Sequence, residues 1–109
     1  MKTSELTGAA LDWCVLHSLD DERLKGADEH YDFDSWGNFS SDWAQGGPII
    51  EREKINVWHV GQNNTFWVGS LDRVDPAPES YGPTPLIAAM RCFVAFKLGD
   101  EIDIPKELL

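Results

Sequence analysis

The sequence predicts an α+β fold in which two main helices pack with a small antiparallel sheet and short helical turns make the connections. Three observations support this fold class. An apolar run near the C-terminus has helix start and stop signals, residues 55–60 and 65–71 carry β-forming residues around a turn, and apolar residues near the N-terminus have helical spacing. The length of 109 residues predicts one domain over residues 1–109.

The first helix is expected from Thr7 to about His17. Threonine is a common helix N-cap, and Leu6 before it can pack back onto the first turn. Residues at helical spacing form the predicted buried face: Leu6, Ala10, Trp13, and Cys14 or His17. Asp12 is expected on the outer side of this helix.

Residues 18–47 show no clean apolar period, so an ordered irregular segment is expected there. Within it we expect one helical turn near Ser41–Gln45, which Gly46-Gly47 would end. Pro48 is expected to open a second short helical turn through Glu51 to Lys54, because proline is common at the first helical position.

A β-hairpin is expected next. Its strands are Ile55–Val60 and Thr65–Leu71, and the turn signal Gly-Gln-Asn-Asn lies between them. Side chains alternate along a strand, so Trp58 and Val60 should share one face, with Val57 and His59 on the other. Residues 75–78, Asp-Pro-Ala-Pro, are interpreted as a stiff linker or an edge.

The clearest element is a helix over Thr84–Leu98, with Thr84 as N-cap, Pro85 at the first helical position and Gly99 as the stop. Eleven of the 13 residues from Leu86 to Leu98 are apolar, which predicts a helix buried between other elements. Ile102 and Ile104 are expected to be extended, followed by a last turn from Pro105 through Leu108. The predicted core comprises Trp13, Leu86, Met90, Phe93, Val94 and one of Trp58 or Trp67.

The charge and the apolar pattern exclude some function classes. The net charge is −10, and Asp20–Asp34 holds seven acidic residues against two basic ones. No basic patch is present, so direct binding to a nucleic-acid backbone is not expected. The longest apolar run has 13 residues, whereas a membrane span needs roughly 20, and the N-terminal residues do not predict a secretory signal.

No metal or cofactor is expected from the motifs. Asp32–Gly37 is similar to the start of a calcium loop, but tryptophans would occupy two of the ligand positions. Cys14 and His17 are one helical turn apart, as in some zinc sites or Cys–His catalytic pairs, yet no second pair of ligands is local. Cys14 and Cys92 are therefore interpreted as reduced, buried thiols, which places the protein in a cytoplasm.

The candidate binding residues are Asp42, Trp43, Gln45, Gly46, Gly47 and Arg91. The first five lie in one segment, where a carboxylate, an indole and an amide could contact a partner or small ligand; otherwise the segment is only a tight turn. Arg91 interrupts an apolar helix. It is expected to pair with an acid such as Asp42 or Asp12, to face solvent, or to enter a pocket for an anion.

We expect the Asp42–Gly47 segment beside the N-terminal part of the helix from Thr84, near the loop Tyr81–Pro83. A helix N-terminus leaves free N–H groups and a positive dipole end. Asp42 would either cap that end or face solvent beside an exposed Trp43, where it could contribute to binding.

Three stretches of the sequence carry a family resemblance. Lys2–Trp13, Asp42–Glu53 and Tyr81–Pro105 resemble, in order and spacing, the NinX-like family of small proteins from lambdoid phages and bacterial prophages. The segment Gly-Pro-Thr-Pro-Leu-Ile-Ala-Ala-Met-Arg is the most specific part. The resemblance implies a phage or prophage origin and a bacterial host cytoplasm. It implies no activity, because the family is one of unknown function.

Three functional hypotheses follow. The first is a non-enzymatic phage or prophage protein that binds a host or phage protein, as the acidic charge and the five tryptophans indicate. The second is a small ligand-binding domain or enzyme that uses the Asp42–Gly47 segment. The third is a mimic of DNA, which would need carboxylates spaced like phosphates.

Overall fold

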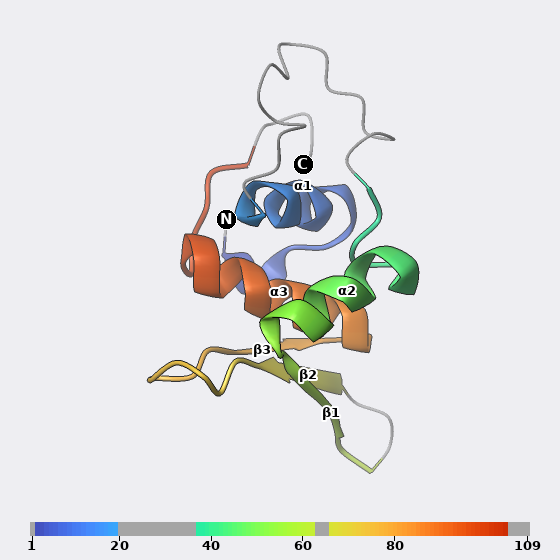
Figure 1. Cartoon of the computed structure of the whole chain (residues 1–109). Helices are drawn as coiled ribbons and strands as arrows, with labels where there is room; N and C mark the ends of the chain where they lie inside the picture. Colours follow the sequence, from blue (N-terminus) through green and yellow to red (C-terminus); the bar gives the residue numbers. More distant parts are fainter. Residues whose placement is uncertain (1, 20–36, 63–65, 105–109) are drawn as a thin grey trace.

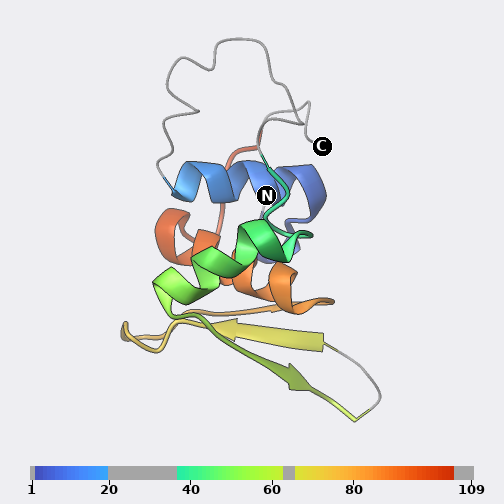
Figure 2. The ribbon, with the colours of Figure 1, turned by 45° about the vertical axis from the view of Figure 1, so that its right-hand side comes forward.

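The computed structural model describes residues 2–19, 37–62 and 66–104, and these build three layers. A small sheet forms one outer layer, helices α2 (Trp43–Glu53) and α3 (Pro85–Leu98) form the middle, and α1 (Gly8–Ser18) forms the other outer layer (Figures 1 and 2). The predicted α+β class is confirmed. The acidic stretch Asp20–Asp34, most of the calcium-like segment and the turn from Pro105 lie outside the described residues.

Helix α3 is the centre of the molecule, and its start and stop signals act as predicted. Thr84 Oγ1 accepts a hydrogen bond from Ile87 N at 3.1 Å, Pro85 is the first helical residue, and Gly99 ends the helix with a φ of 92°. Both sides of α3 are covered, by the sheet and by α1, so it is buried nearly all round. The predicted core residues Leu86, Met90, Phe93 and Val94 are all buried.

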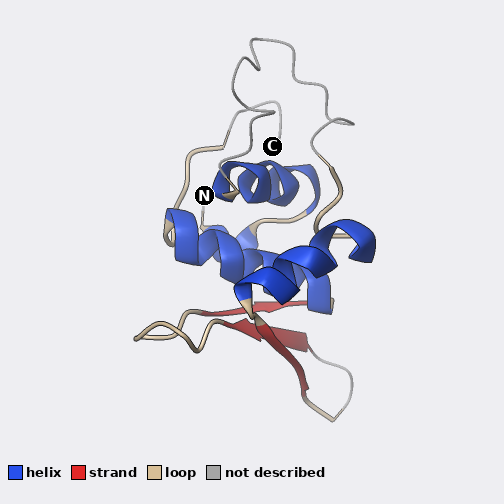
Figure 3. Cartoon of the chain, viewed as in Figure 1, coloured by secondary structure: helices blue, strands red, loops and turns tan. Residues whose placement is uncertain are grey.

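The sheet contains the predicted hairpin and one further strand (Figure 3). Strands β1 (Asn56–Val60) and β2 (Phe66–Ser70) pair antiparallel, with Trp58 opposite Val68. Strand β3 (Glu79–Gly82) pairs antiparallel with β2, with Tyr81 also opposite Val68, so the strand order is β1-β2-β3. Residues 75–78, expected as a linker or an edge, lead directly into this edge strand.

The two faces of the sheet carry very different side chains. The inner face, towards α3, includes Gly69 and Gly82, where an added Cβ would come within 2.9 Å of the Ala88 backbone. The outer face, by strand alternation and register, carries Trp58, Val60, Phe66, Val68 and Tyr81. Trp58 and Val60 therefore share a face as predicted. Of the two candidate core tryptophans, Trp58 is exposed and Trp67 is half-buried on the inner face.

Helix α2 corrects the prediction of two short turns separated by glycines. It runs unbroken through Gly46-Gly47 and keeps Pro48 in its interior. Proline normally disfavours helical backbone at the preceding residue, partly through a clash with that residue's Cβ, and Gly47 has no Cβ. Lys54 caps the C-terminal end of the helix in a left-handed backbone conformation with a φ of 58°. Next to it, Ile55 N donates a hydrogen bond to Ile50 O at 3.0 Å.

Helix α1 begins and ends within one residue of the prediction, but its buried face is wider than expected. Asp12, predicted on the outer side, is buried, whereas His17 is exposed and Trp13 only partly buried. Asp12 Oδ1 accepts a hydrogen bond from Ser40 N at 2.8 Å, because residues 39–40 cover that side of the helix. Helix α1 is therefore packed both against α3 and against the segment that leads into α2.

The first and last described segments contact each other through hydrogen bonds and a β-bridge. Thr3, in the short helix η1 (Thr3–Glu5), donates two hydrogen bonds: its N–H to Asp100 O at 2.8 Å and its hydroxyl to Gly99 O at 2.6 Å. Lys2 and Glu101 form an antiparallel β-bridge. Ile102 and Ile104, which follow without helix, pack partly buried against the core.

Candidate functional site

The outer face of the sheet carries three of the four exposed Trp, Phe and Tyr side chains among the described residues. Three of its aromatic side chains stay open to solvent: Trp58 is 41% exposed, Phe66 36% and Tyr81 52%. The rings of Phe66 and Tyr81 meet edge-to-face with centroids 5.4 Å apart. Val68 lies opposite both Trp58 and Tyr81 and is only 2% exposed, although it is not part of the main core. The aromatic side chains thus shield Val68 from solvent, while they remain exposed to solvent themselves.

One end of this aromatic face has an acidic rim. Asp72, just after β2, accepts hydrogen bonds from the Asn56 amide at 2.6 Å and from the Ser70 hydroxyl at 2.9 Å. These contacts fix a carboxylate at the end of the face. Glu79, two residues before Tyr81 on the same strand, adds a second carboxylate on the same face. A strongly negative chain therefore presents exposed rings beside fixed negative charge.

The predicted Asp42–Gly47 segment forms the first turn of α2, and its polar groups bond within the chain. Asp42 Oδ1 accepts from Ala44 N at 2.9 Å, so Asp42 caps its own helix. Gln45 donates to Asp42 Oδ2 at 3.2 Å and accepts from Asn38 N at 2.7 Å. Both side chains thus organise the start of α2.

The segment does lie beside the N-terminal part of α3, as predicted. Ser40, Ser41 and Trp43 line a pocket of about 290 Å³ together with residues 84–87. An added Cβ at Gly46 would collide with the Phe39 carbonyl oxygen, whereas Gly47 has ordinary space. The expectation that Asp42 caps α3 is wrong, because Thr84 caps that helix. Trp43 is 56% exposed, and the binding role of the segment stays a prediction.

Arg91 does not join the α2 segment and has neither Asp42 nor Asp12 as a partner. Its Nε donates to Leu6 O at 2.8 Å and its Nη1 donates to Tyr81 O at 2.6 Å. The residue is 9% exposed, and burial lowers the pKa of its guanidinium. Among the described residues no carboxylate pairs with it. Arg91 also lines a pocket of about 630 Å³ at the edge of β3, and its role in binding an anion stays a prediction.

The two thiols are buried and unpaired with each other. Burial raises the pKa of Cys14 and of Cys92 to about 12, so both are neutral near pH 7. No three side chains of His, Cys, Asp or Glu converge on a common point within the described part of the chain. No helix in that part has the length and apolar character to cross a membrane.

The fold and surface define a small, acidic α+β protein with a three-stranded sheet and exposed aromatic rings. A family model described as Bacteriophage P22, NinX matches residues 2–97, and the chain belongs to this family. The resemblance found in three separate stretches therefore extends over nearly the whole chain. A comparison with curated proteins finds no match.

Sequence reasoning missed the aromatic face as a unit. Phe66 and Tyr81 were not singled out, and Trp58 was considered only as a core residue. The signal that could have found the face is alternation: large residues at Trp58, Phe66 and Tyr81, with small residues Gly69, Ser80 and Gly82 on the opposite face. That signal becomes readable only when the register of β3 with β2 is known.

Proposed function

We propose that this phage-family protein acts by binding another protein, and that the outer face of the sheet is its contact surface. The observation that carries the proposal is the group of exposed rings at Trp58, Phe66 and Tyr81, held by a paired sheet. Tryptophan and tyrosine dominate the energetics of protein interfaces, since a large rigid ring is desolvated at little cost in side-chain entropy. Strand pairing already fixes the positions of these rings before a partner arrives.

The charge of the chain indicates what chemistry the partner has. With a net charge of −10, a fixed carboxylate at Asp72 and a second carboxylate at Glu79 beside the rings, the surface favours an apolar patch surrounded by Lys and Arg. The same charge disfavours a second copy of the chain on this face, because two chains of −10 repel each other. The proposed occupant is therefore a basic host or phage protein with an apolar contact patch.

Binding rather than catalysis is supported by the state of the reactive groups. The two thiols are buried and neutral, and the carboxylate and amide of the Asp42–Gly47 segment bond to their own helix. An alternative binding surface remains at Trp43, which is exposed beside the 290 Å³ pocket at the start of α3. A cytoplasmic location in the bacterial host is part of the proposal, since the partner must be reachable there.

A capture experiment with matched tryptophan variants tests the proposal. The wild-type chain, Trp58→Ser and Trp43→Ala would be immobilised and exposed to lysate of a phage-infected bacterial host. We expect one or more basic proteins to be retained by the wild type and by Trp43→Ala, and at least tenfold less by Trp58→Ser. Retention should fall steeply in 1 M salt, where the Debye length is about 3 Å.

Other results would overturn this assignment. Equal capture by wild type and Trp58→Ser, or no capture at all, contradicts the sheet surface. Loss of capture only in Trp43→Ala would move the site to the start of α2. Sedimentation of the purified chain at low and high salt provides a further check, because a stable dimer abolished by Trp58→Ser would make the face a self-association surface.

A further inference from the structure

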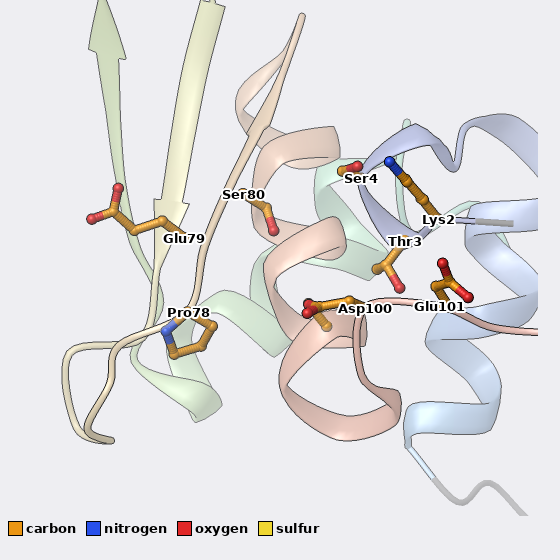
Figure 4. Close-up of a pocket in the computed structure, with 9 residues that line it drawn as sticks. Lys2, Thr3, Ser4, Pro78, Glu79, Ser80, Asp100 and Glu101 are labelled. Atoms are coloured by element: carbon orange, nitrogen blue, oxygen red, sulfur yellow. The ribbon is translucent and has the colours of Figure 1, made fainter.

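The free edge of β3 forms one wall of a groove that borders the aromatic face, because Phe66 and Tyr81 also line its larger pocket. Two adjoining pockets, of about 290 and 630 Å³, share Ser4, Glu79 and Ser80 in their linings. Figure 4 shows the strand with Glu79 and Ser80 on one side, Lys2–Ser4 with Asp100 and Glu101 on the other, and α3 between them. Ala95 contributes to the first pocket and Arg91 to the second, one turn apart on α3. The groove therefore follows α3 along the strand edge.

The backbone of β3 leaves hydrogen-bonding groups open towards this groove. In an antiparallel pair only alternate residues direct their N–H and C=O at the neighbouring strand. Pro78 O accepts from Leu71 N at 3.2 Å, which places residues 78, 80 and 82 on the bonded side towards β2. Glu79 and Tyr81 consequently direct their backbone groups away from β2. The bond from Arg91 to Tyr81 O, on that far side, agrees with this assignment.

Arg91 links the two walls of the groove near the Tyr81 end. Its guanidinium bonds to Tyr81 O on the strand wall and to Leu6 O just after η1, so it joins the two walls. Two of its five N–H groups are used in these bonds, and no described carboxylate takes the others. Pro83 follows β3 and has no N–H, so a strand added at this edge has no ladder to continue along beyond Arg91.

We propose that this groove binds the C-terminal segment of a partner protein as an added strand, with its terminal carboxylate held by Arg91. Adding a strand to an exposed edge provides affinity through backbone hydrogen bonds, here with Glu79 and Tyr81. Because Arg91 lies at the Tyr81 end, the segment enters near Pro78 and runs parallel to β3. Pro83 ends the row of backbone donors just past Tyr81, so a terminal carboxylate bound by Arg91 fits this end.

The other end of the groove selects the residues that come before the carboxylate. Asp100 and Glu101 line it opposite Pro78 and Glu79, with Lys2 as the opposing charge. Two carboxylates, of Asp100 and Glu101, against one ammonium favour a Lys or Arg side chain a few residues before the end of the bound segment. This site adds a second ligand and does not depend on the aromatic face being the contact surface proposed above.

The test uses the full chain and three pools of random hexapeptides immobilised through their N-termini. One pool ends in a free α-carboxylate, the second in an amide, and the third in an Asp residue whose own C-terminus is amidated. We expect retention on the carboxylate pool to exceed retention on either amide pool at least tenfold, with Lys or Arg enriched two to four residues before the end. Amide resonances of Glu79 and Tyr81 should shift when a selected peptide is added.

Matched variants separate this site from its surroundings. Arg91→Lys keeps the charge but loses the planar fork and should weaken retention at least fivefold, with folding checked by circular dichroism. Glu79→Pro removes an N–H that points away from β2 and should weaken retention while the β1–β2 hairpin persists. Trp58→Ser should leave peptide retention unchanged, even if it abolishes capture of the basic partner.

Several results would overturn the strand-addition site. Equal retention on carboxylate and amide pools, or none on any pool, contradicts it. Equal retention on the Asp-amide pool would show that a side-chain carboxylate suffices and that the segment need not terminate. Wild-type retention by a folded Glu79→Pro chain would exclude strand addition at this edge.

Discussion

The inner face of the sheet has small residues where it meets α3, although it also carries Trp67, and the outer face has large exposed rings. The face packed on α3 carries glycines at 69 and 82 and a serine at 80, whereas the face open to solvent carries Trp58, Phe66 and Tyr81. Helix α3 supplies Ala88 and Ala89 at the contact, so both partners are small and their backbones approach closely. Burial here is achieved by close approach, and the large aromatic area is left available for other contacts.

The largest loss of stability is expected from a substitution in α3, the helix that the inner face of the sheet covers. Phe93 is fully buried in the core cluster with residues of α1 and α3. Phe93→Ala should lower the free energy of unfolding by about 3–5 kcal/mol, because it removes a buried ring and leaves a cavity. Urea denaturation followed by far-ultraviolet circular dichroism measures this value. A loss well under 1 kcal/mol would mean that the face of α3 carrying Phe93 is misplaced.

A smaller loss is expected when the inner face gains a single carbon atom. A Cβ at Gly69 would lie 2.7 Å from Ala88 O and 3.0 Å from Ala89 Cα, and both are backbone atoms that cannot rotate away. Gly69→Ala should therefore lower the free energy of unfolding by about 1–3 kcal/mol, in the range of overpacked cores. A chain as stable as the wild type would show that the sheet and α3 have more space between them.

The smallest loss of stability is expected on the outer face, despite the largest change in volume. Trp58→Ser removes an indole that is 41% exposed and opposite Val68. The free energy of unfolding should change by less than about 1 kcal/mol, because substitutions at exposed positions usually have small effects. A loss comparable with that of Phe93→Ala would make Trp58 a core residue and remove the contrast between the two faces.

The elements that could be predicted are those whose signals are local. The start and stop of α3 depend on Thr84, Pro85 and Gly99, which act within one turn, and the β1–β2 hairpin depends on alternation around a short turn. Strand β3 has four residues and pairs with β2 across the 71–78 loop, so its existence depends on a contact that no short window contains. Helix α2 was divided in the prediction because Gly-Gly-Pro is ordinarily a helix breaker.

The sequence predicted where the Asp42–Gly47 segment lies, but it did not predict the hydrogen-bond partners of Arg91. The sequence placed Asp42–Gly47 beside the start of α3, and the structure agrees. It offered several partners for Arg91, but the two carbonyls that accept its bonds belong to Leu6 and Tyr81, which are 85 and 10 residues away. Carbonyl acceptors are present at every residue, so residue type alone does not indicate them. Those two bonds link the two walls of the groove beside β3.

The contacts between the first and last described segments have a consequence for how the chain is made. Thr3 bonds to Gly99 and Leu6 to Arg91, which are 96 and 85 residues further along the chain, and α1 packs against α3, so part of the surroundings of α1 is synthesised much later than α1 itself. During translation, α1 leaves the ribosome before α3, so the apolar residues of α1 that pack against α3 are still exposed to solvent. Contacts of such sequence separation slow folding, because a long loop must close before they form. Helix α1 is therefore enclosed only after α3 has been synthesised, and the nascent chain exposes it to chaperones until then.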